Sequence, residues 1–396
     1  MTSAPPLRVV HAAENIKGGV GTYLRDLVVA QRASFGEGSV VVVVPRSQSG
    51  VLRSPAGVEI VTFDDRGPRW RSTLRLASCM QAVMARVDAS VVHLHSTFAG
   101  LALRPLLRWA PTRRDRKPAV VYCAHGWSFD RETSAASRRL AIMLERALAP
   151  TCDAIVCISG HEMSLARLAG IPARRLTHIA NGIPLRPPVA ATTARRPDWP
   201  SGKRRVLFVG RFDRQKGIDI LMAALHALPD SAFACLVGSA VLRDGSLLEL
   251  PDNVRMTGWL AEPELAAYYE TADVLVVPSR WEGFGLTVAE AMRAGLPVIA
   301  SCVGGLAEVV EDGVTGLLVR PNSSAALIEA IRDLDTESLK SMGEAGRRRF
   351  VEHFTLDRMH VQLTALYQRL RAQKDLAQAN DRRPPPRVQP ESSPNA

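Results

Sequence analysis

The chain has 396 residues, of which 46% are hydrophobic and 22% are charged, a composition that favours a packed globular protein and excludes a disordered one. Its length suits two domains of ordinary size better than one. The formal net charge of +11 is unevenly spread, because residues 1–200 carry 27 Lys and Arg against 14 Asp and Glu, whereas residues 201–396 carry 23 against 25.

The apolar runs of the chain are too short for a transmembrane helix. The longest, residues 40–44, consists of five valines and ends at a proline, whereas a membrane helix needs roughly 20 apolar residues. The N-terminus also lacks the basic segment followed by an apolar stretch that marks a secretory signal. We therefore expect a cytoplasmic protein.

In the first half of the chain, short apolar segments alternate with longer amphipathic ones. This alternation is typical of α/β folds with parallel sheets, and it predicts an N-terminal Rossmann-like domain over residues 1–183. The predicted strands are residues 7–13, 40–44, 58–63, 90–95, 119–124, 154–158 and 176–179.

The proline-rich segment 184–203 has the composition of a linker. After it the alternation restarts, which predicts a second Rossmann-like domain over residues 204–355. We expect a helix over 356–374 to return to the N-terminal domain and the tail 375–396, rich in Pro, Ser and Arg, to be disordered. The predicted strands of the second domain are residues 205–209, 233–237, 253–257, 274–277, 298–301 and 316–319.

A glycine-containing loop follows one buried strand of the second half and reads PSRWEGFGLTVAEAM over residues 278–292. Gly283 and Gly285 allow the backbone to approach a ligand closely. The helix that begins after them offers unpaired N–H groups and a positive dipole end, which suits a diphosphate. Glu282 and Glu290 can face the same cleft, where ionised carboxylates accept hydrogen bonds from sugar hydroxyls.

A second block reads VLFVGRFDRQKG over residues 206–217, where a buried strand runs into Gly210 and Arg211. Lys216 stands at a predicted helix start, and because cations are unfavourable at a helix N-terminus, this placement indicates a bound anion. Arg211 and Lys216 together could neutralise a departing nucleotide diphosphate. Ligands of open α/β sheets bind beyond the carboxyl ends of the strands, so both blocks predict one site between the domains.

These two blocks closely resemble the retaining family-four glycosyltransferases, also called glycosyl transferases group 1, which have the GT-B fold. The resemblance spans roughly residues 7–355 and is most specific in 205–319. It implies two Rossmann-like, doubly wound parallel-sheet domains that face a central cleft. The resemblance extends to the segments GGVG, NGI, GGLAE and DGVTGLLV at residues 18–21, 181–183, 304–308 and 312–319.

The resemblance also implies roles for individual residues. Glu290 would bind the ribose hydroxyls, and Glu282 would meet the transferred sugar near its 3-hydroxyl. Arg211 and Lys216 would hold the diphosphate, and His125 matches a histidine of the N-terminal domain beside the transferred sugar. The remaining donor-binding positions that it implies, several of them through their backbone N–H groups, are Gly18, Gly19, Asn181, Gly210, Gly283, Phe284, Gly285 and Leu286.

Two departures from known patterns bear on these assignments. The family commonly has Asp after the Asn-Gly-Ile segment, whereas this chain has Pro184, which removes a hydrogen-bond acceptor at that position. The first loop, residues 14–19, does not follow the GxGxxG pattern of dinucleotide-binding proteins, so the sequence does not favour an oxidoreductase.

Four histidines invite a metal hypothesis. His93 and His95 alternate along a strand and therefore share one face, whereas His11 lies within another predicted strand and His125 directly follows a third. No Asp or Glu ligand set accompanies them, and the family that the chain resembles needs no metal. We therefore expect no metal and no cofactor, with the nucleotide-sugar acting as a co-substrate.

Two basic segments lie in the positively charged half, residues 66–75, which also hold a tryptophan, and residues 112–117. They are either ordinary surface loops or a docking site for the anionic inner face of the plasma membrane, where each basic residue contributes about 1 kcal/mol and Trp favours the interface. The second interpretation suits a lipid-linked acceptor. We expect no nucleic-acid partner.

The sequence thus predicts hexosyl transfer from a nucleoside-diphosphate sugar to a hydroxyl of a sugar or lipid-linked acceptor, with retention, in a bacterial polysaccharide or glycolipid pathway. Two alternatives remain open. A nucleotide-sugar epimerase on the same fold would isomerise the donor without an acceptor. A non-enzymatic binding protein for an anionic ligand would show no donor-dependent chemistry.

Overall fold

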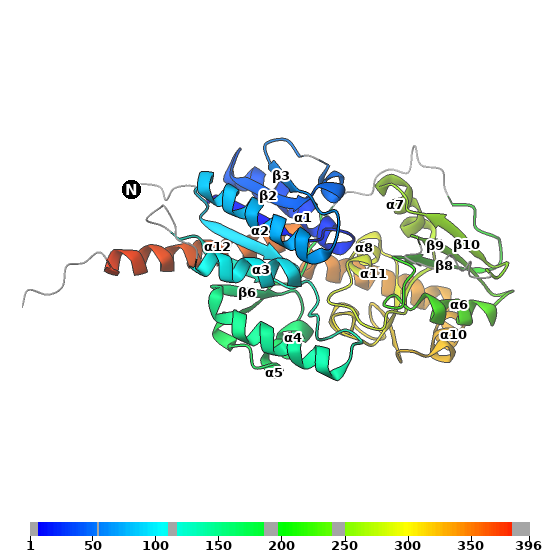
Figure 1. Ribbon diagram of the computed structural model, residues 1–396. Helices are drawn as coiled ribbons and strands as arrows, with labels where there is room; N and C mark the ends of the chain where they lie inside the picture. The colour runs from blue at the N-terminus through cyan, green and yellow to red at the C-terminus, as the bar shows by residue number, and fades with distance from the viewer. Residues whose placement is uncertain (1–6, 54, 110–116, 186–196, 240–249, 382–396) are drawn as a thin grey trace, which may run out of the picture.

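The structure, a computed structural model, describes residues 7–53, 55–109, 117–185, 197–239 and 250–381 (Figure 1). Most of the basic segment 112–117, most of the predicted linker and the end of the predicted tail lie outside these ranges. The described residues form two α/β domains, each built on one parallel sheet. This confirms the prediction of two doubly wound parallel-sheet domains.

The N-terminal sheet has seven parallel strands in the order β3-β2-β1-β4-β5-β6-β7. The strand order reverses between β1 and β4, which is where ligand crevices form in open α/β sheets. Its central strands are buried on both faces and therefore read as continuous apolar runs. The strands are β1 (Val9–Ala13), β2 (Val40–Pro45), β3 (Glu59–Phe63), β4 (Val91–His95), β5 (Ala119–Cys123), β6 (Ala154–Cys157) and β7 (Leu176–His178).

Helices cover both faces of this sheet. α1 and the C-terminal helix α12 pack together on one face, whereas α2, α3 and α5 contribute buried side chains to the core on the other face. Residues 66–75 were interpreted above as a surface loop, but most of this segment is helical because α2 already begins at Arg69. The helices are α1 (Gly19–Phe35), α2 (Arg69–Arg86), α3 (Thr97–Trp109), α4 (Ala135–Leu148) and α5 (Gly160–Leu168), with short 3-10 helices at Arg46–Leu52, Ala149–Thr151 and Ala173–Arg175.

The C-terminal sheet has six parallel strands in the order β10-β9-β8-β11-β12-β13, which again reverses beside its first strand. Its strands are β8 (Arg204–Val209), β9 (Ala232–Val237), β10 (Val254–Gly258), β11 (Val274–Val277), β12 (Val298–Ser301) and β13 (Gly316–Val319). Its helices are α6 (Ile218–His226), α7 (Glu262–Thr271), α8 (Leu286–Ala294), α9 (Leu306–Val309), α10 (Ser324–Asp333) and α11 (Thr336–His353).

The chain crosses between the domains twice, and the two crossings are joined by backbone hydrogen bonds. Ile183 N donates to the carbonyl oxygen of Phe354 (3.0 Å), and Leu356 N donates to that of Ile183 (2.8 Å). A Cβ atom on Gly182 would lie only 2.2 Å from the carbonyl oxygen of Thr355, so the close approach requires glycine. The two crossings therefore form one compact joint between the domains.

The C-terminal helix α12 (Leu356–Asp381) lies along the N-terminal domain, and Figure 1 shows its end projecting beyond that domain. His360 and Tyr367 on this helix bond to Ser34 (2.8 Å) and His93 (2.6 Å). The helix continues through residues 375–381, which were predicted to belong to a disordered tail. None of the helices in the described ranges is long and apolar enough to span a membrane.

Candidate functional site

The loop between β11 and α8 is shaped by four glycines. Gly285 has a positive φ of 95° and caps α8, and Gly305 N donates to the carbonyl oxygen of Glu282 at 2.9 Å. A Cβ atom on Gly304 would lie 2.0 Å from that oxygen, and one on Gly305 would lie 2.3 Å from the carbonyl oxygen of Gly283. The glycine pair before α9 therefore supports the Glu282 loop by close backbone contact.

Lys216 and Glu282, both predicted site residues, form an ion pair. Lys216 Nζ lies 2.6 Å from Glu282 Oε2, and the two side chains are 16% and 14% exposed. Gly217, in the left-handed region at φ 65°, lets the chain pass the end of β11, since a Cβ atom there would lie 2.0 Å from the carbonyl oxygen of Pro278. The structure thus holds a cation at a strand end, shielded from most of the solvent.

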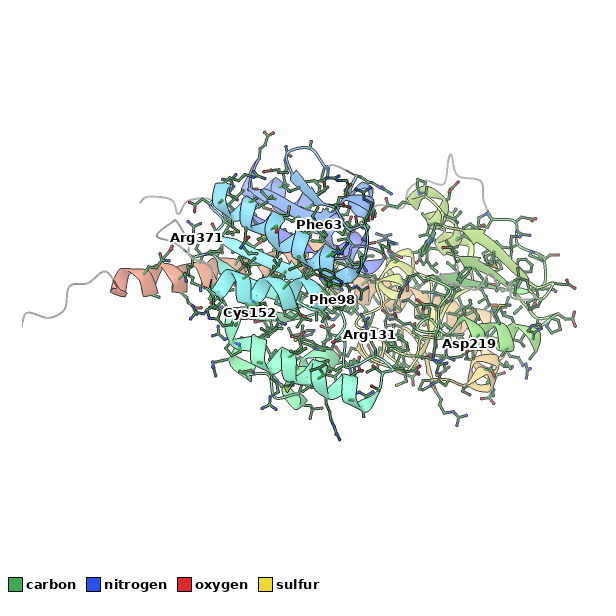
Figure 2. The ribbon with its side chains drawn as sticks, viewed as in Figure 1. Phe63, Phe98, Arg131, Cys152, Asp219 and Arg371 are labelled. Atoms are coloured by element: carbon green, nitrogen blue, oxygen red, sulfur yellow. The ribbon has the colours of Figure 1, made fainter. Side chains whose placement is uncertain are left out.

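Arg211 lies further out than Lys216. Its guanidinium is 45% exposed, pairs with Asp213 (3.2 Å) and donates to Gln215 (2.9 Å). Arg131 of the N-terminal domain lies at the boundary between the domains (Figure 2). Burial lowers its pKa, and so do the positive charges of Arg211 and of a second arginine nearby. This third cation was not predicted, because only the fold brings residue 131 to the C-terminal domain.

Glu290 lies on α8 beside a cavity between the domains. Its Oε2 accepts a hydrogen bond from Tyr269 of α7 at 2.8 Å, and burial raises its pKa. The cavity has a volume of about 190 Å³, and Thr22 and Arg25 of α1 line its opposite side. Tyr269 was not predicted as part of the site, since no local pattern pairs it with Glu290.

The N-termini of α1 and α8 face each other across the cleft. Gly18, with a φ of 73°, precedes α1, and a Cβ atom on Gly19 would lie 3.3 Å from Leu286 Cδ1 at the start of α8. The two helix N-termini, each of which offers unpaired N–H groups and the positive end of a dipole, therefore lie close together. This arrangement favours an anionic ligand such as a diphosphate.

His125 follows β5 in the left-handed region, with a φ of 54°. Its Nε2 lies 2.9 Å from His95 Nδ1, and Tyr23 of α1 packs edge-on against its ring at a centroid distance of 4.7 Å. The next residue, Gly126, touches the Glu282 loop, because a Cβ atom on Gly283 would lie 3.4 Å from Gly126 Cα. The structure therefore brings His125 to the loop that carries Glu282.

The other predicted positions are placed as follows. Gly210 directly follows β8, and a Cβ atom added there would lie 3.7 Å from Lys216 Cδ. The side chain of Phe284 is buried against Phe354 (ring centroids 5.5 Å apart), so only its backbone can face a ligand. Asn181 is 3% exposed beside the joint between the domains, and its buried Oδ1 has no hydrogen-bond partner within the described ranges.

Two glutamates that were not predicted join the halves of the site. Glu308 of α9 accepts hydrogen bonds from Gly160 N (2.7 Å) and from His161 N at the start of α5, which ties the two domains together. Glu162, also on α5, accepts from Gly126 N (2.5 Å) and holds the turn beside His125. Glu308 ends the GGLAE segment that carries part of the family resemblance, but no role was assigned to it, and no local sequence signal marks Glu162.

Glu162 makes folding stability depend on pH. Burial raises its pKa to about 7 from 4.5, although hydrogen bonds from Ile158 N and Gly126 N oppose the shift. Because the folded-state pKa is the higher one, its stabilising contribution is complete below about pH 4.5 and is lost as the pH rises through 7. The loss amounts to about 3 kcal/mol.

We therefore expect the free energy of unfolding of the wild type to fall relative to that of Glu162→Gln between pH 4.5 and pH 8. Urea titrations of both proteins at several pH values measure this difference. The variant also loses one backbone hydrogen bond, which gives an offset that does not vary with pH, so only the slope is diagnostic. A difference that stays constant over this range would contradict the shifted pKa.

The histidines gather in the core behind His125. His11, His93 and His95 are fully buried, and their ring nitrogens lie within 4.8 Å of one another, which makes them a candidate metal group. His11 and His95 use both ring nitrogens in hydrogen bonds, one of them the 2.9 Å contact between His11 Nδ1 and His95 Nε2. His93 Nδ1 lies 2.6 Å from the Tyr367 hydroxyl, and the buried His93 Nε2 has no hydrogen-bond partner within the described ranges. The geometry is that of mutually hydrogen-bonded imidazoles.

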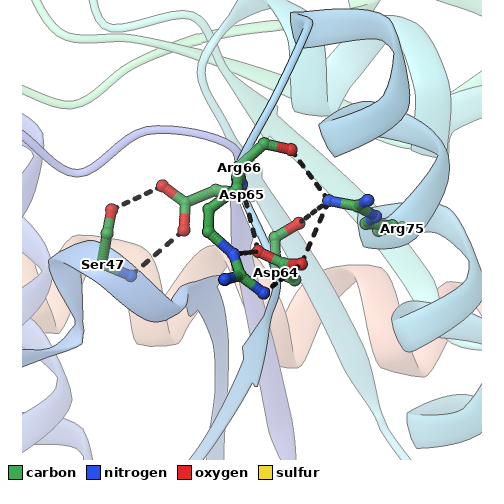
Figure 3. A network of polar contacts seen from close by, with 5 residues as sticks. All are labelled: Ser47, Asp64, Asp65, Arg66 and Arg75. Atoms are coloured by element: carbon green, nitrogen blue, oxygen red, sulfur yellow. Dashed lines mark hydrogen bonds and ion pairs between the residues drawn. The ribbon is translucent and has the colours of Figure 1, made fainter.

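Several arginines of the basic segment 66–75 are paired with carboxylates of the protein itself. Asp64 accepts hydrogen bonds from the Arg66 side chain and pairs with Arg75, and these contacts lower its pKa to about 2 (Figure 3). Arg69 pairs with Glu14 at 3.2 Å. Much of the positive charge in this segment is therefore neutralised within the protein.

Two family models match the chain. The model described as glycosyltransferase family 4 covers residues 17–186, and the model described as glycosyl transferases group 1 covers residues 191–349. The boundary between the two matches falls in the segment that joins the domains.

Three similar proteins span nearly the same length. An uncharacterized 41.2 kDa protein in the cps region of Klebsiella pneumoniae is 32% identical over 82% of this chain and 88% of its own. A D-inositol 3-phosphate glycosyltransferase of Xylanimonas cellulosilytica is 30% identical over 93% of both chains. The solved structure of HepE from Anabaena in complex with UDP and glucose, at 19% identity, covers 91% of this chain and 99% of its own, with a TM-score of 0.75.

Proposed function

Because this chain belongs to the glycosyltransferases with the GT-B fold, we propose that it moves a hexosyl group from a nucleoside-diphosphate sugar to a hydroxyl acceptor. The proposal includes retention of the anomeric configuration, which the resemblance to the family-four enzymes implies. The observation that carries it is the largely buried Lys216–Glu282 pair beside the facing N-termini of α1 and α8.

In this proposal the diphosphate lies beside Gly19 and Leu286, where two helix N-termini and Lys216 meet its charge. The nucleoside extends toward the cavity beside Glu290, whose carboxylate accepts hydrogen bonds from the ribose hydroxyls. The sugar lies near Glu282 and His125. The solved HepE complex with UDP and glucose, a protein of the same fold, supports a nucleotide-sugar as the ligand.

Transfer follows a dissociative course. As the bond between the anomeric carbon and the diphosphate oxygen breaks, negative charge grows on the leaving group, and preorganised positive groups stabilise it. Lys216, Arg211 and Arg131 bring three cations to this region. These groups do what a divalent metal ion does in other transferases, so we propose that the reaction needs no metal. The acceptor hydroxyl attacks from the face that the leaving group departs and gives its proton to the departing diphosphate oxygen, which yields retention without a covalent intermediate.

The acceptor is proposed to be a sugar or a lipid-linked sugar in a bacterial polysaccharide or glycolipid pathway. The relative in the cps region of Klebsiella pneumoniae supports such a setting. So does the excess of positive charge in the N-terminal half, since the phosphate groups of a lipid-linked acceptor are anionic.

The function is tested by a thermal-shift screen with UDP-, GDP- and ADP-sugars, followed by mass and NMR analysis after incubation with candidate acceptors. We expect one nucleotide to stabilise the protein and its sugar to appear in a new linkage with unchanged anomeric configuration. A sugar isomer formed from the donor alone would identify an epimerase. Absence of any donor-dependent shift would favour a non-enzymatic binding protein.

We also propose that the N-terminal domain docks on the anionic inner face of the plasma membrane. Trp70 and Leu74 on α2 are 60% and 59% exposed, and the Arg71 guanidinium stacks on the Trp70 ring. On α4, Leu140, Met143 and Leu144 form a second exposed apolar row. Aromatic and aliphatic side chains beside arginines suit the interface of an anionic bilayer.

The double variant Trp70→Ser/Leu74→Ser should lower the partition coefficient on anionic liposomes at low salt at least about tenfold, because each buried apolar side chain contributes about 1.5–3 kcal/mol. Sedimentation with phosphatidylglycerol vesicles measures it. Leu168→Ser is the matched control, since Leu168 is an exposed leucine elsewhere in the same domain. A wild-type protein that stays entirely in the supernatant would refute the docking proposal.

A further inference from the structure

An unbroken chain of hydrogen bonds runs from His125 into the core of the N-terminal domain. His125 Nε2 lies 2.9 Å from His95 Nδ1, and His95 Nε2 lies 2.9 Å from His11 Nδ1. His11 Nε2 in turn lies 2.7 Å from Gln31 Oε1 on α1. The chain therefore links the edge of the cleft to the buried side of α1 through three imidazole rings.

The three imidazoles of this chain are neutral. Burial lowers the pKa of His11 to about 4 and that of His125 to about 3, and burial with the neighbouring histidines holds the pKa of His95 well below its usual value. A neutral imidazole has one N–H donor and one nitrogen lone pair. Each ring in the chain must therefore donate in one direction and accept from the other.

The direction of the chain is set at its buried end. The Gln31 Oε1 atom can only accept, so His11 carries its proton on Nε2 and accepts on Nδ1. His95 must then donate from Nε2, accept on Nδ1 and take the proton of His125 Nε2. The remaining nitrogen of His125, Nδ1, then carries a lone pair. This atom is not among the buried atoms without a hydrogen-bond partner, so its lone pair is not sealed inside the core.

We propose that Gln31, His11 and His95 are positioning residues that hold His125 in its Nε2–H tautomer and so make Nδ1 a hydrogen-bond acceptor for a hydroxyl of the donor sugar. The proposal rests on the proposed function for the identity of that hydroxyl, but the tautomer itself is a property of the unliganded protein. His125 would then select a ligand that presents an O–H at this point.

Two other uses of the chain fit the structure less well. A proton relay needs an ionisable group or bulk water at its far end, whereas this chain ends at the buried amide of Gln31. A metal site at His11, His93 and His95 needs their lone pairs, whereas His11 and His95 already use both ring nitrogens in hydrogen bonds. Fixing the tautomer uses each hydrogen bond from Gln31 to His125.

The test uses the full chain labelled with 15N-histidine. Two-bond correlations between ring protons and nitrogens report the tautomer of each of the nine histidines, and His125→Gln assigns the signals of His125. We expect the wild type to show a protonated Nε2 and an unprotonated Nδ1 at His125. Gln31→Leu removes the acceptor that sets the direction, so the Nδ1–H form should become populated, whereas Gln31→Glu, whose carboxylate is also an acceptor, should preserve the wild-type tautomer.

His93→Phe is the matched control. The His93 ring packs at a tilt against that of His95, at a centroid distance of 4.2 Å, and bonds to Tyr367, but it lies outside the chain. The control disturbs the same core and leaves a buried hydroxyl unpaired, yet it should leave the His125 tautomer unchanged. A loss of folding stability shared by His93→Phe and Gln31→Leu is thereby separated from the effect on His125.

If the chain transfers sugar, kcat/KM for the donor should fall roughly three- to tenfold in Gln31→Leu and recover in Gln31→Glu. The tautomer measurement stands alone if no transfer is found. An Nδ1–H tautomer in the wild type, or an unchanged tautomer in Gln31→Leu, would overturn the proposal. So would a stoichiometric metal ion in the purified protein, measured by mass spectrometry, that is lost in His11→Phe.

Discussion

Replacing Lys216 with Ala is expected to lower sugar transfer by roughly 10²–10³-fold, the usual cost of removing one preorganised charge from the transition state. The reason is its position: the ammonium lies 2.6 Å from Glu282 and is 16% exposed, so it acts where water screens it little. Since the charge on the leaving group grows as the reaction proceeds, the loss should appear in kcat more than in KM.

The expected effect is measured as initial rate of nucleoside-diphosphate release with the donor found in the thermal-shift screen. Lys203→Ala is the matched control, because Lys203 precedes β8 at the opposite end of the strand from Lys216 and bonds only to a backbone carbonyl among the described residues. Circular dichroism and thermal unfolding of both variants verify the fold. A Lys216→Ala enzyme with near-normal turnover would remove Lys216 from the mechanism.

Glu290→Ala should weaken binding of the nucleoside diphosphate by roughly ten- to 150-fold, because hydrogen bonds to a charged group contribute about 1.5–3 kcal/mol. Glu290 is held by Tyr269 at 2.8 Å and lines the cavity between the domains, so its carboxylate is oriented before the ligand arrives. Unlike Lys216, it is expected to interact equally with ground state and transition state, so the effect should appear in KM.

Calorimetry with the bound nucleotide and with its 2′,3′-dideoxy analogue measures this contribution. If Glu290 binds the ribose hydroxyls, Glu290→Ala should weaken the ordinary nucleotide and leave the affinity for the dideoxy analogue nearly unchanged. Glu329→Ala, on the exposed face of α10, is the matched control. An equal loss for both nucleotides would place the effect of Glu290 on folding or on another part of the ligand.

The strands and the backbone turns of the site were predictable from local sequence. Buried parallel strands need apolar side chains on both faces, so the valine run of β2 could be recognised directly. Gly217 and Gly285 adopt positive φ at the starts of helices, where other residues would be strained. Such local requirements depend only on consecutive residues, and this is why the two predicted blocks lie at strand ends as expected.

The partners of the site residues could not be predicted, because they depend on how distant segments meet. Tyr269 reaches Glu290 from another helix, Glu308 ties α9 to α5, and Arg131 approaches Arg211 from the other domain. Two predictions from composition were wrong. Residues from Arg69 onward form a helix although their charge indicated a surface loop. Residues 375–381 remain helical because Leu, Ala and Gln favour helix, although they were assigned to a disordered tail.

A nucleoside diphosphate is expected to bind beside the N-termini of α1 and α8, and a crystal structure with the stabilising nucleotide shows its position. We expect the diphosphate against Gly19 and Leu286, within reach of Lys216, with the ribose hydroxyls on Glu290. A diphosphate bound elsewhere, or a ribose that does not contact Glu290, would refute this position of the donor.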